Sequence, residues 1–374
     1  MRRIPVFVVV AALVQYRTAS TAEFQWQAAS PESQGMSAAK LDAARQKLAK
    51  RGTKTLLVIR NDRIVYEWYA SDFSRTKPHG TASLAKALVG GVSLALAIND
   101  GLLSPDDPAG KFIPQWRDDP KKSKILIRHL ATHSSGIEDA EQDRIPHEKL
   151  PGWKGAFWRR DPDPFTIARD QAPVISEPGS AFHYSNPGMA MLAYAVTASL
   201  KNSDHKDIRT LLRDRVMRPI GVPDAEWSIG YGKTYDVDGL PLCANWGGGS
   251  YSADATARVG RLFLRKGDWE GRQLIRRDVV DLVLKDAGAP KPDRSLPEGP
   301  CPRSGLAWWV NSDGVWPRVP RDAFGGSGAG NQTLLVIPSL NLIIVRNGGQ
   351  IMPDSFWGGT EEFLFNPILD ALQK

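Results

Sequence analysis

The chain has 374 residues, a length that suits one large domain with an insertion or two lobes that share one core. Its hydrophobic content of 42% and charged content of 24% are those of a globular protein and argue against a disordered chain. The formal net charge is +7, but no basic run is interleaved with aromatic residues, so nucleic-acid binding is not expected.

The first 22 residues have the pattern of an export signal. Arg2 and Arg3 precede an apolar run over residues 4–14 that is too short to span a bilayer. Ser20-Thr21-Ala22 then forms a cleavage site of small residues before Glu23. We therefore expect a periplasmic or secreted mature chain without stable membrane insertion, with an uncleaved N-terminal anchor as the alternative. Cleavage removes three arginines and no acid, so the formal charge falls from +7 to +4.

The two cysteines, Cys243 and Cys301, leave their redox state open. Export permits a disulfide between them, but two cysteines do not make a framework, and both can equally be free. Neither has a histidine or a cysteine at ligand spacing beside it, so we expect no zinc site.

The N-terminal part of the mature chain is predicted to form a helix and a β-hairpin. Ser37 is a capping residue for a helix that runs to Lys50. Strand-like runs cover residues 55–60 and 64–69, and Asn61-Asp62 between them is typical of a tight turn.

Helices dominate the middle of the sequence, and strands return at its end. The most apolar helix is expected over 83–100, with others near 189–200, 207–217 and 253–266; later strands are expected over 305–310, 333–337 and 342–346, before a helix over 361–372. This order predicts an α+β fold, in which an antiparallel sheet built from both chain ends is flanked by helices and interrupted by a large, mainly helical insertion. The sheet lobe would hold about 23–80 and 300–374, and the helical lobe about 81–299.

A Ser-x-x-Lys pair opens the apolar helix at Ser83 and Lys86. The chain contains three other such pairs, but these begin in polar loops or on a surface helix: Ser37/Lys40, Ser74/Lys77 and Ser203/Lys206. Residues three apart share a helix face, so the amine can reach the hydroxyl, and burial moves the lysine pKa down towards that of a working base. The alternative is that Ser83 only caps the helix and Lys86 extends to water.

Two further motifs carry chemistry of the same kind. Tyr184 and Asn186 form the one Tyr-x-Asn of the chain, where a tyrosine can serve as a second base and an asparagine can orient substrate or lysine. A glycine-rich segment, residues 325–332, precedes the strand over 333–337, where glycines admit a substrate close to a strand edge and a backbone N–H can stabilise an oxyanion. Taken alone, the tyrosine can equally be a buried side chain and the segment an ordinary loop.

These three motifs, in this order, resemble those of the serine β-lactamase and penicillin-binding-protein superfamily. Within it the chain is most similar to the class C-related branch, which includes DD-peptidases, esterases and 6-aminohexanoate-dimer hydrolases. The segments 125–137 and 246–260 resemble stretches of the same branch. The resemblance implies a β-lactamase/transpeptidase-like fold, with Ser83 as the acylated nucleophile and Lys86 and Tyr184 as its base pair. The oxyanion hole would consist of the backbone N–H groups of Ser83 and Ala329, and no metal or cofactor is implied.

The resemblance also implies residues that contact a small-molecule or peptide substrate: Asn186, Gly326, Ser327 and Gly328. Trp246 is a further substrate-binding candidate because of its aromatic side chain. Gly326 stands where related enzymes carry a lysine or histidine that holds a substrate carboxylate, so an ester or amide without that carboxylate fits better. A β-lactamase or DD-carboxypeptidase acting on cell-wall peptides, and a penicillin-binding sensor with little turnover, are the alternatives. Trp246, Trp308, Trp309 and Trp316 are candidates for lining an apolar acyl pocket, although such residues are more often core.

A Ser-His-Asp hydrolase is the nearest rival chemistry. It needs Gly-x-Ser-x-Gly and a later histidine, whereas the segment around Ser327 ends in Ala329 and the last histidine is His205. The order therefore fails, and we expect His129, His133 and His183 to be core or loop residues.

Overall fold

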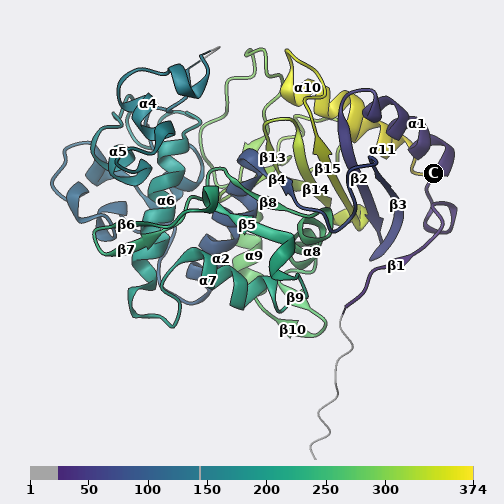
Figure 1. The fold of residues 1–374 in the computed structure, drawn as a ribbon, viewed down its shortest axis with the longest axis horizontal. Coiled ribbons are helices and arrows are strands. Elements are labelled where there is room, and N and C mark those ends of the chain that lie inside the picture. The colour runs from purple at the N-terminus through teal and green to yellow at the C-terminus, as the bar shows by residue number, and fades with distance from the viewer. Residues whose placement is uncertain (1–23, 143–144, 374) are drawn as a thin grey trace, which may run out of the picture.

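A computed structural model describes residues 24–142 and 145–373 of the chain (Figure 1). The predicted export signal, residues 1–22, lies outside the described residues. Figure 1 shows the sheet with α1, α10 and α11 in one half of the molecule, and α4 to α7 in the other half.

The N-terminal helix and hairpin are confirmed. Helix α1 covers Ala38–Ala49, and the Ser37 side chain accepts a hydrogen bond from the Lys40 N–H, as a cap does. Strands β2 (Thr53–Arg60) and β3 (Arg63–Tyr69) pair antiparallel. The two turn residues, Asn61 and Asp62, have φ of 53° and 60°, which is the left-handed pair that a two-residue hairpin requires.

The two ends of the chain meet in one eight-stranded sheet, in the order β1-β3-β2-β15-β14-β13-β12-β11. Its central pairing is antiparallel, with Val58 of β2 opposite Ile344 of β15. The other strands are β1 (Gln27–Ala28), β11 (Arg303–Ser304), β12 (Trp309–Val310), β13 (Phe324–Gly328), β14 (Gln332–Ile337) and β15 (Leu342–Gly348). The pairs are antiparallel except that β1 runs parallel to β3, so the α+β prediction is confirmed with a mixed edge.

Each face of the sheet is covered by helices. On β2, Leu57 and Val58 belong to two different hydrophobic clusters, because successive strand residues point to opposite faces. The cluster around Val58 includes residues of α1 and of the C-terminal helical run, formed by α10 (Phe356–Thr360), Glu361–Phe365 and α11 (Asn366–Asp370). The cluster around Leu57 includes α8 (Ala253–Leu264), which packs on β14 and β15 although the sequence places it in the helical lobe. This second cluster continues into the helical half, so both halves share one core.

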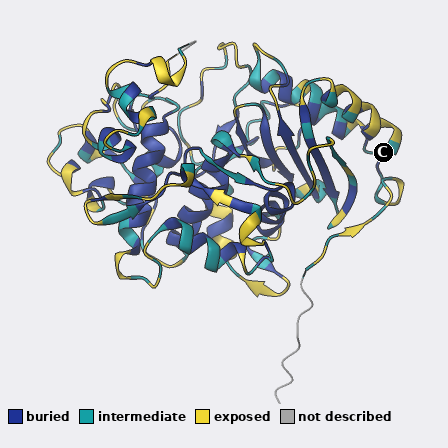
Figure 2. Cartoon of the chain, viewed as in Figure 1, coloured by how far each residue is buried: buried dark blue, intermediate teal, exposed yellow. Residues whose placement is uncertain are grey.

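The predicted apolar helix is a continuous helical segment with changing geometry. It runs through Ala82–Leu84 and a π-helical turn, Lys86–Gly91, into α2 (Val92–Asn99). Among the described residues, Ala82–Asn99 is long and apolar enough to cross a membrane, but 83% of it is buried inside the protein, as in a core helix. Figure 2 shows the central strands of the sheet and α6 buried in the same way.

The remaining elements surround this buried segment. Helix α6 covers Asn186–Ser199, directly after Tyr184, and α7 covers Ile208–Leu212. The other helices are α3 (Ile127–Ala131), α4 (Gly152–Arg159), α5 (Pro164–Asp170) and α9 (Arg277–Leu284). The short strands are β4 (His79–Gly80), β5 (Trp227–Ile229), β6 (Tyr235–Val237), β7 (Leu240–Leu242), β8 (Gly249–Tyr251), β9 (Asp268–Trp269) and β10 (Arg272–Gln273).

Two predicted elements differ in extent from the structure. The strand predicted over 305–310 is confirmed only at Trp309–Val310, which form β12. After β11 the backbone leaves the sheet, because the Leu306 N–H donates to the Val283 carbonyl and the Ala307 N–H to the Ala131 carbonyl. The C-terminal helical run begins at Phe356, before 361. The glycines at 325–328 belong to strand β13, so the alternative of an ordinary loop does not hold for them. Cys243 and Cys301 are both free thiols.

Candidate active site

Ser83 lies in a strained turn at the start of the buried helical segment. Ala82, directly before it, has φ of 46°, a left-handed conformation that residues other than glycine rarely adopt. The Thr81 hydroxyl donates to the Gly248 carbonyl at 3.0 Å and so fastens this turn to the segment after Trp246. Strain of this kind clusters at functional sites, which makes Ser83 a candidate for chemistry.

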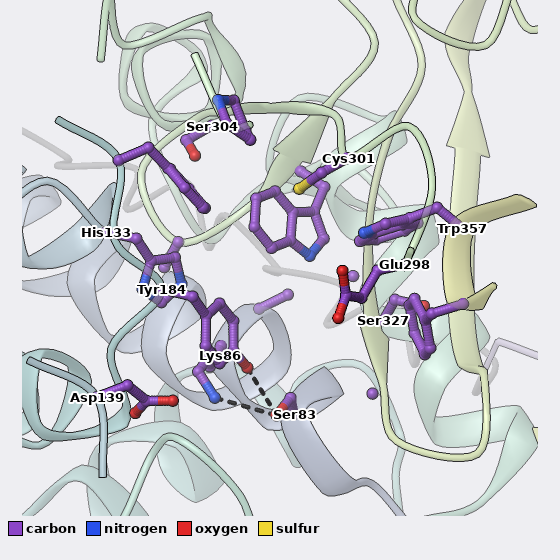
Figure 3. Close-up of a pocket in the computed structure, with 18 of the residues that line it drawn as sticks. Ser83, Lys86, His133, Asp139, Tyr184, Glu298, Cys301, Ser304, Ser327 and Trp357 are labelled. Atoms are coloured by element: carbon purple, nitrogen blue, oxygen red, sulfur yellow. Dashed lines mark hydrogen bonds between the residues drawn. The ribbon is translucent and has the colours of Figure 1, made fainter. Parts of the chain in front are cut away.

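Two side chains donate hydrogen bonds to the Ser83 hydroxyl (Figure 3). The Tyr184 hydroxyl donates a hydrogen bond to Ser83 Oγ at 2.8 Å, and Lys86 Nζ donates one at 3.1 Å. Lys86 comes from the same helical turn, whereas Tyr184 arrives 101 residues later, just before α6. The structure therefore brings the three predicted catalytic residues together.

Lys86 is buried, and its amine makes three hydrogen bonds. Besides Ser83, its amine donates to Asn186 Oδ1 and to the Trp246 carbonyl, each at 2.7 Å. Burial lowers the pKa of Lys86 to about 7, although the Asp139 and Glu141 carboxylates act in the opposite direction. An amine with this pKa is neutral in a large fraction of molecules near neutral pH, so it can accept a proton.

Asp139 fixes the orientation of the Asn186 side chain. Its Oδ1 accepts hydrogen bonds from the Asn186 backbone N–H at 2.8 Å and from Asn186 Nδ2 at 3.1 Å. The amide nitrogen therefore faces Asp139, and the amide oxygen is left to accept from Lys86. Burial and the nearby Glu141 carboxylate raise the pKa of Asp139. Asn186, which we expected to contact substrate, is itself buried at 1% exposure and positions the lysine.

Tyr184 is held by a neutral histidine. Its ring stacks on His133 with centroids 4.5 Å apart, and His133 Nδ1 accepts a hydrogen bond from the Ser185 N–H at 3.2 Å. Burial lowers the pKa of His133 to about 3 and raises the pKa of Tyr184 well above its ordinary value. Both side chains are therefore uncharged at neutral pH, and Tyr184 carries its proton.

Strand β13 runs directly past the nucleophile. A Cβ added to Gly328 would lie 2.7 Å from the Ser83 nitrogen and 2.5 Å from the Thr81 carbonyl oxygen. Only glycine permits this approach. The next residue, Ala329, lines the same cavity as Ser83.

The cavity has a volume of about 590 Å³ and extends from Ser83 towards the edge of the sheet (Figure 3). Trp308 and Trp309 line it, as do Gly326, Ser327 and Gly328. Trp246 does not: its indole packs on Phe157 and Phe165 in the core, and only its carbonyl serves the site, through Lys86. Trp316 packs on Trp357 and Phe365 outside this cavity.

The sequence pattern as a whole matches a known family. The family model described as β-lactamase aligns with residues 41–347, which is most of the chain and includes every motif above. The chain belongs to the β-lactamase family. It is a serine hydrolase of that family.

Relatives of this β-lactamase-family chain carry several activities in their names. It is 25% identical over 349 residues to the 6-aminohexanoate-dimer hydrolase of Paenarthrobacter ureafaciens, which covers 90% of this chain and 82% of that one. A family VIII carboxylesterase has the same fold, with a TM-score of 0.65 at 15% identity over 92% of this chain and 99% of the esterase. The penicillin-binding protein of Bacillus halodurans also has this fold, with a TM-score of 0.57 at 17% identity over 85% of this chain and 96% of that one.

The β-lactamase-family chain departs from the expected pattern at Gly326 for a packing reason. A Cβ at this position would lie 2.7 Å from both Ala87 Cβ and Leu84 Cδ1. The helical segment of Ser83 therefore occupies the space that a basic side chain would need.

Sequence reasoning missed several residues that this family member places at the site. Asp139 shares no helix face or motif with Lys86, although its place just after the 125–137 segment was an available signal. His183 lies in a loop, as expected, and it also lines the cavity, which was not expected. His129 is a structural residue as expected, since its Nδ1 accepts from the Leu126 N–H at 3.2 Å.

Proposed function

We propose that this chain is a secreted hydrolase that cleaves an ester or amide bond through an acyl-enzyme on Ser83. The observation that carries the proposal is the convergence of Lys86 Nζ and the Tyr184 hydroxyl on Ser83 Oγ. Export is proposed from residues 1–22, and the first residue of the mature chain, expected to be Glu23, can be read by mass spectrometry.

In the proposed mechanism, neutral Lys86 takes the proton of Ser83 as its Oγ attacks the substrate carbonyl carbon. The oxyanion is stabilised by the backbone N–H groups of Ser83 and Ala329. The C–O or C–N bond then breaks, and Tyr184 passes a proton to the leaving group while it is resupplied from Lys86. Water attacks the acyl-enzyme with the same pair as base, which releases the acid and returns the proton to Ser83.

The lining of the cavity favours a substrate without a carboxylate. Gly326 offers no cation there, and Lys86 has its three hydrogen bonds already assigned. The names of the relatives, a 6-aminohexanoate-dimer hydrolase and a carboxylesterase, are consistent with amide or ester cleavage. The alternatives are a β-lactamase or DD-carboxypeptidase, and a penicillin-binding sensor with little turnover.

A substrate panel tests this function. We expect the mature protein to hydrolyse p-nitrophenyl butyrate with a kcat/KM at least about tenfold above that for nitrocefin or a D-Ala-D-Ala peptide, because a missing carboxylate partner costs a charge-assisted hydrogen bond. Ser83→Ala is the control that must lose all of these activities. Turnover of nitrocefin or the peptide alone would contradict the ester preference, and a single burst without steady turnover would support the sensor.

A further inference from the structure

The cavity beside Ser83 is lined by acids. Four carboxylate residues line it: Asp139, Glu141, Asp293 and Glu298. Among the described lining residues, Lys86 is the one lysine or arginine. Lys86 is already bound to three acceptors. The neighbouring Arg294 does not line the cavity, because its guanidinium donates to the Cys301 carbonyl and pairs with Asp313 at 2.8 Å.

Glu298 differs from the other three acids in having a free carboxylate. Asp139 accepts from Asn186, Glu141 lies 3.6 Å from His147, and Asp293 accepts from Ser295. Within residues 24–142 and 145–373, the exposed Glu298 side chain has no hydrogen bond or ion pair with the protein, although the Trp357 N–H fixes its main chain by donating to the Glu298 carbonyl at 2.6 Å. Figure 3 shows this carboxylate pointing into the cavity between Trp357 and Ser83.

Aromatic rings form a corner next to Glu298. The rings of Trp309 and Trp357 lie 5.7 Å apart at 84°, and those of Phe356 and Trp357 lie 4.9 Å apart at 90°. All three residues line the cavity. These pairs pack edge-to-face. A cation is attracted to the face of an aromatic ring, and quaternary ammonium groups are recognised by several rings around them.

A buried hydroxyl also points to a ligand in this cavity. Ser304 is 5% exposed, lines the cavity, and its Oγ has no hydrogen-bond partner among the described residues. A buried hydroxyl without a partner is unfavourable, so a polar group of a bound molecule would satisfy it. Besides the Ser83 hydroxyl, the lining of the cavity therefore includes a polar group that is unsatisfied among the described residues.

We propose that Glu298, with the aromatic corner of Trp309, Phe356 and Trp357, binds an organic cation in the substrate, an ammonium or quaternary ammonium group. The inference rests on the proposed hydrolase function and names the substrate class of that same site. The carboxylate offsets the free-energy cost of moving the substrate cation out of water, and the rings bind the apolar surface of the alkylated nitrogen. The same lining repels a substrate carboxylate, as Gly326 already suggested.

Matched esters that differ only in charge test the proposal. Butyrylcholine is compared with 3,3-dimethylbutyl butyrate, and the p-nitrophenyl ester of 4-(trimethylammonio)butanoic acid with that of 5,5-dimethylhexanoic acid. We expect the cationic member of at least one pair to have a kcat/KM about tenfold above its neutral isostere. Glu298→Gln should reduce this ratio by about tenfold, mainly through KM, whereas Glu362→Gln, on the outer helix, should leave the ratio as it is.

The outcomes separate the two proposals. Equal kcat/KM within both pairs, with steady hydrolysis of all four esters, overturns cation recognition and leaves the hydrolase function standing. Absence of turnover with every ester overturns the hydrolase function instead. Binding provides the independent readout: butyrylcholine should bind to Ser83→Ala in calorimetry and about tenfold more weakly to Ser83→Ala/Glu298→Gln, and equal binding to both proteins overturns the inference.

Discussion

Replacing Lys86 with methionine should lower kcat/KM for p-nitrophenyl butyrate by about 10²- to 10⁴-fold. The methionine fills the same buried space but can neither take the Ser83 proton nor donate to Asn186 and Trp246. Steady-state kinetics measure the loss, and a thermal melt checks that the protein remains folded. The matched control is Lys206→Met, which alters another Ser-x-x-Lys pair whose lysine is exposed, and it should retain full activity.

The pH profile of the unaltered protein separates a base from a merely structural lysine. Only the neutral amine can accept a proton, and burial places the Lys86 pKa at about 7. Below that pH, kcat/KM should therefore fall about tenfold per unit, and above it the value should level off. The Lys86→Met variant should not show this decrease in kcat/KM at low pH. A profile that is flat from about pH 5 to about pH 9, or a Lys86→Met variant within about twofold of the parent, would contradict the assignment.

Adding a single methyl group at Gly326 should destabilise the protein by about 1–3 kcal/mol. Its Cβ would meet Ala87 and Leu84 at 2.7 Å, so the Ser83 helix and β13 would have to separate. Gly326→Lys should therefore unfold or distort the site and not create a carboxylate-binding enzyme. Unfolding in denaturant, monitored by circular dichroism, measures the change.

Gly80→Ala is the matched control for this prediction. A Cβ at Gly80 meets nothing within 4 Å, and Gly80 likewise lies in a strand close to the nucleophile. It should change the free energy of unfolding by less than about 0.5 kcal/mol. If Gly326→Ala were as stable as Gly80→Ala, the packing explanation for the absent basic residue would be wrong.

The sequence was informative where chemistry and local pattern coincide. Ser83 and Lys86 share one helical turn, so their contact follows from spacing, and the apolar run around them predicts the burial that lowers the lysine pKa. Tyr184 could be placed beside them only through the resemblance to a family. The N-terminal hairpin and the strands over 333–337 and 342–346 were predictable because alternating apolar residues and turn residues act over short distances.

The remaining features depend on contacts that no local pattern encodes. Trp246 shows this, because its position near the site was expected but the orientation of its side chain was not. Its indole packs on Phe157 and Phe165, which are far away in sequence, so that only its carbonyl faces Lys86. The apolar run at 305–310 resembles a strand, yet the N–H groups of Leu306 and Ala307 donate to carbonyls outside the sheet. Asp139 and Glu298 belong to no motif, and only the fold brings them to the cavity.

The most direct test of the central claim is the mass of the peptide that contains Ser83 after reaction with a fluorophosphonate. The acyl-enzyme account predicts one adduct per molecule, located on Ser83 and absent from Ser83→Ala. Lys86→Met should acquire the adduct about 10²-fold or more slowly. An adduct on another residue, or labelling of Ser83→Ala at the same rate and extent, would contradict the account.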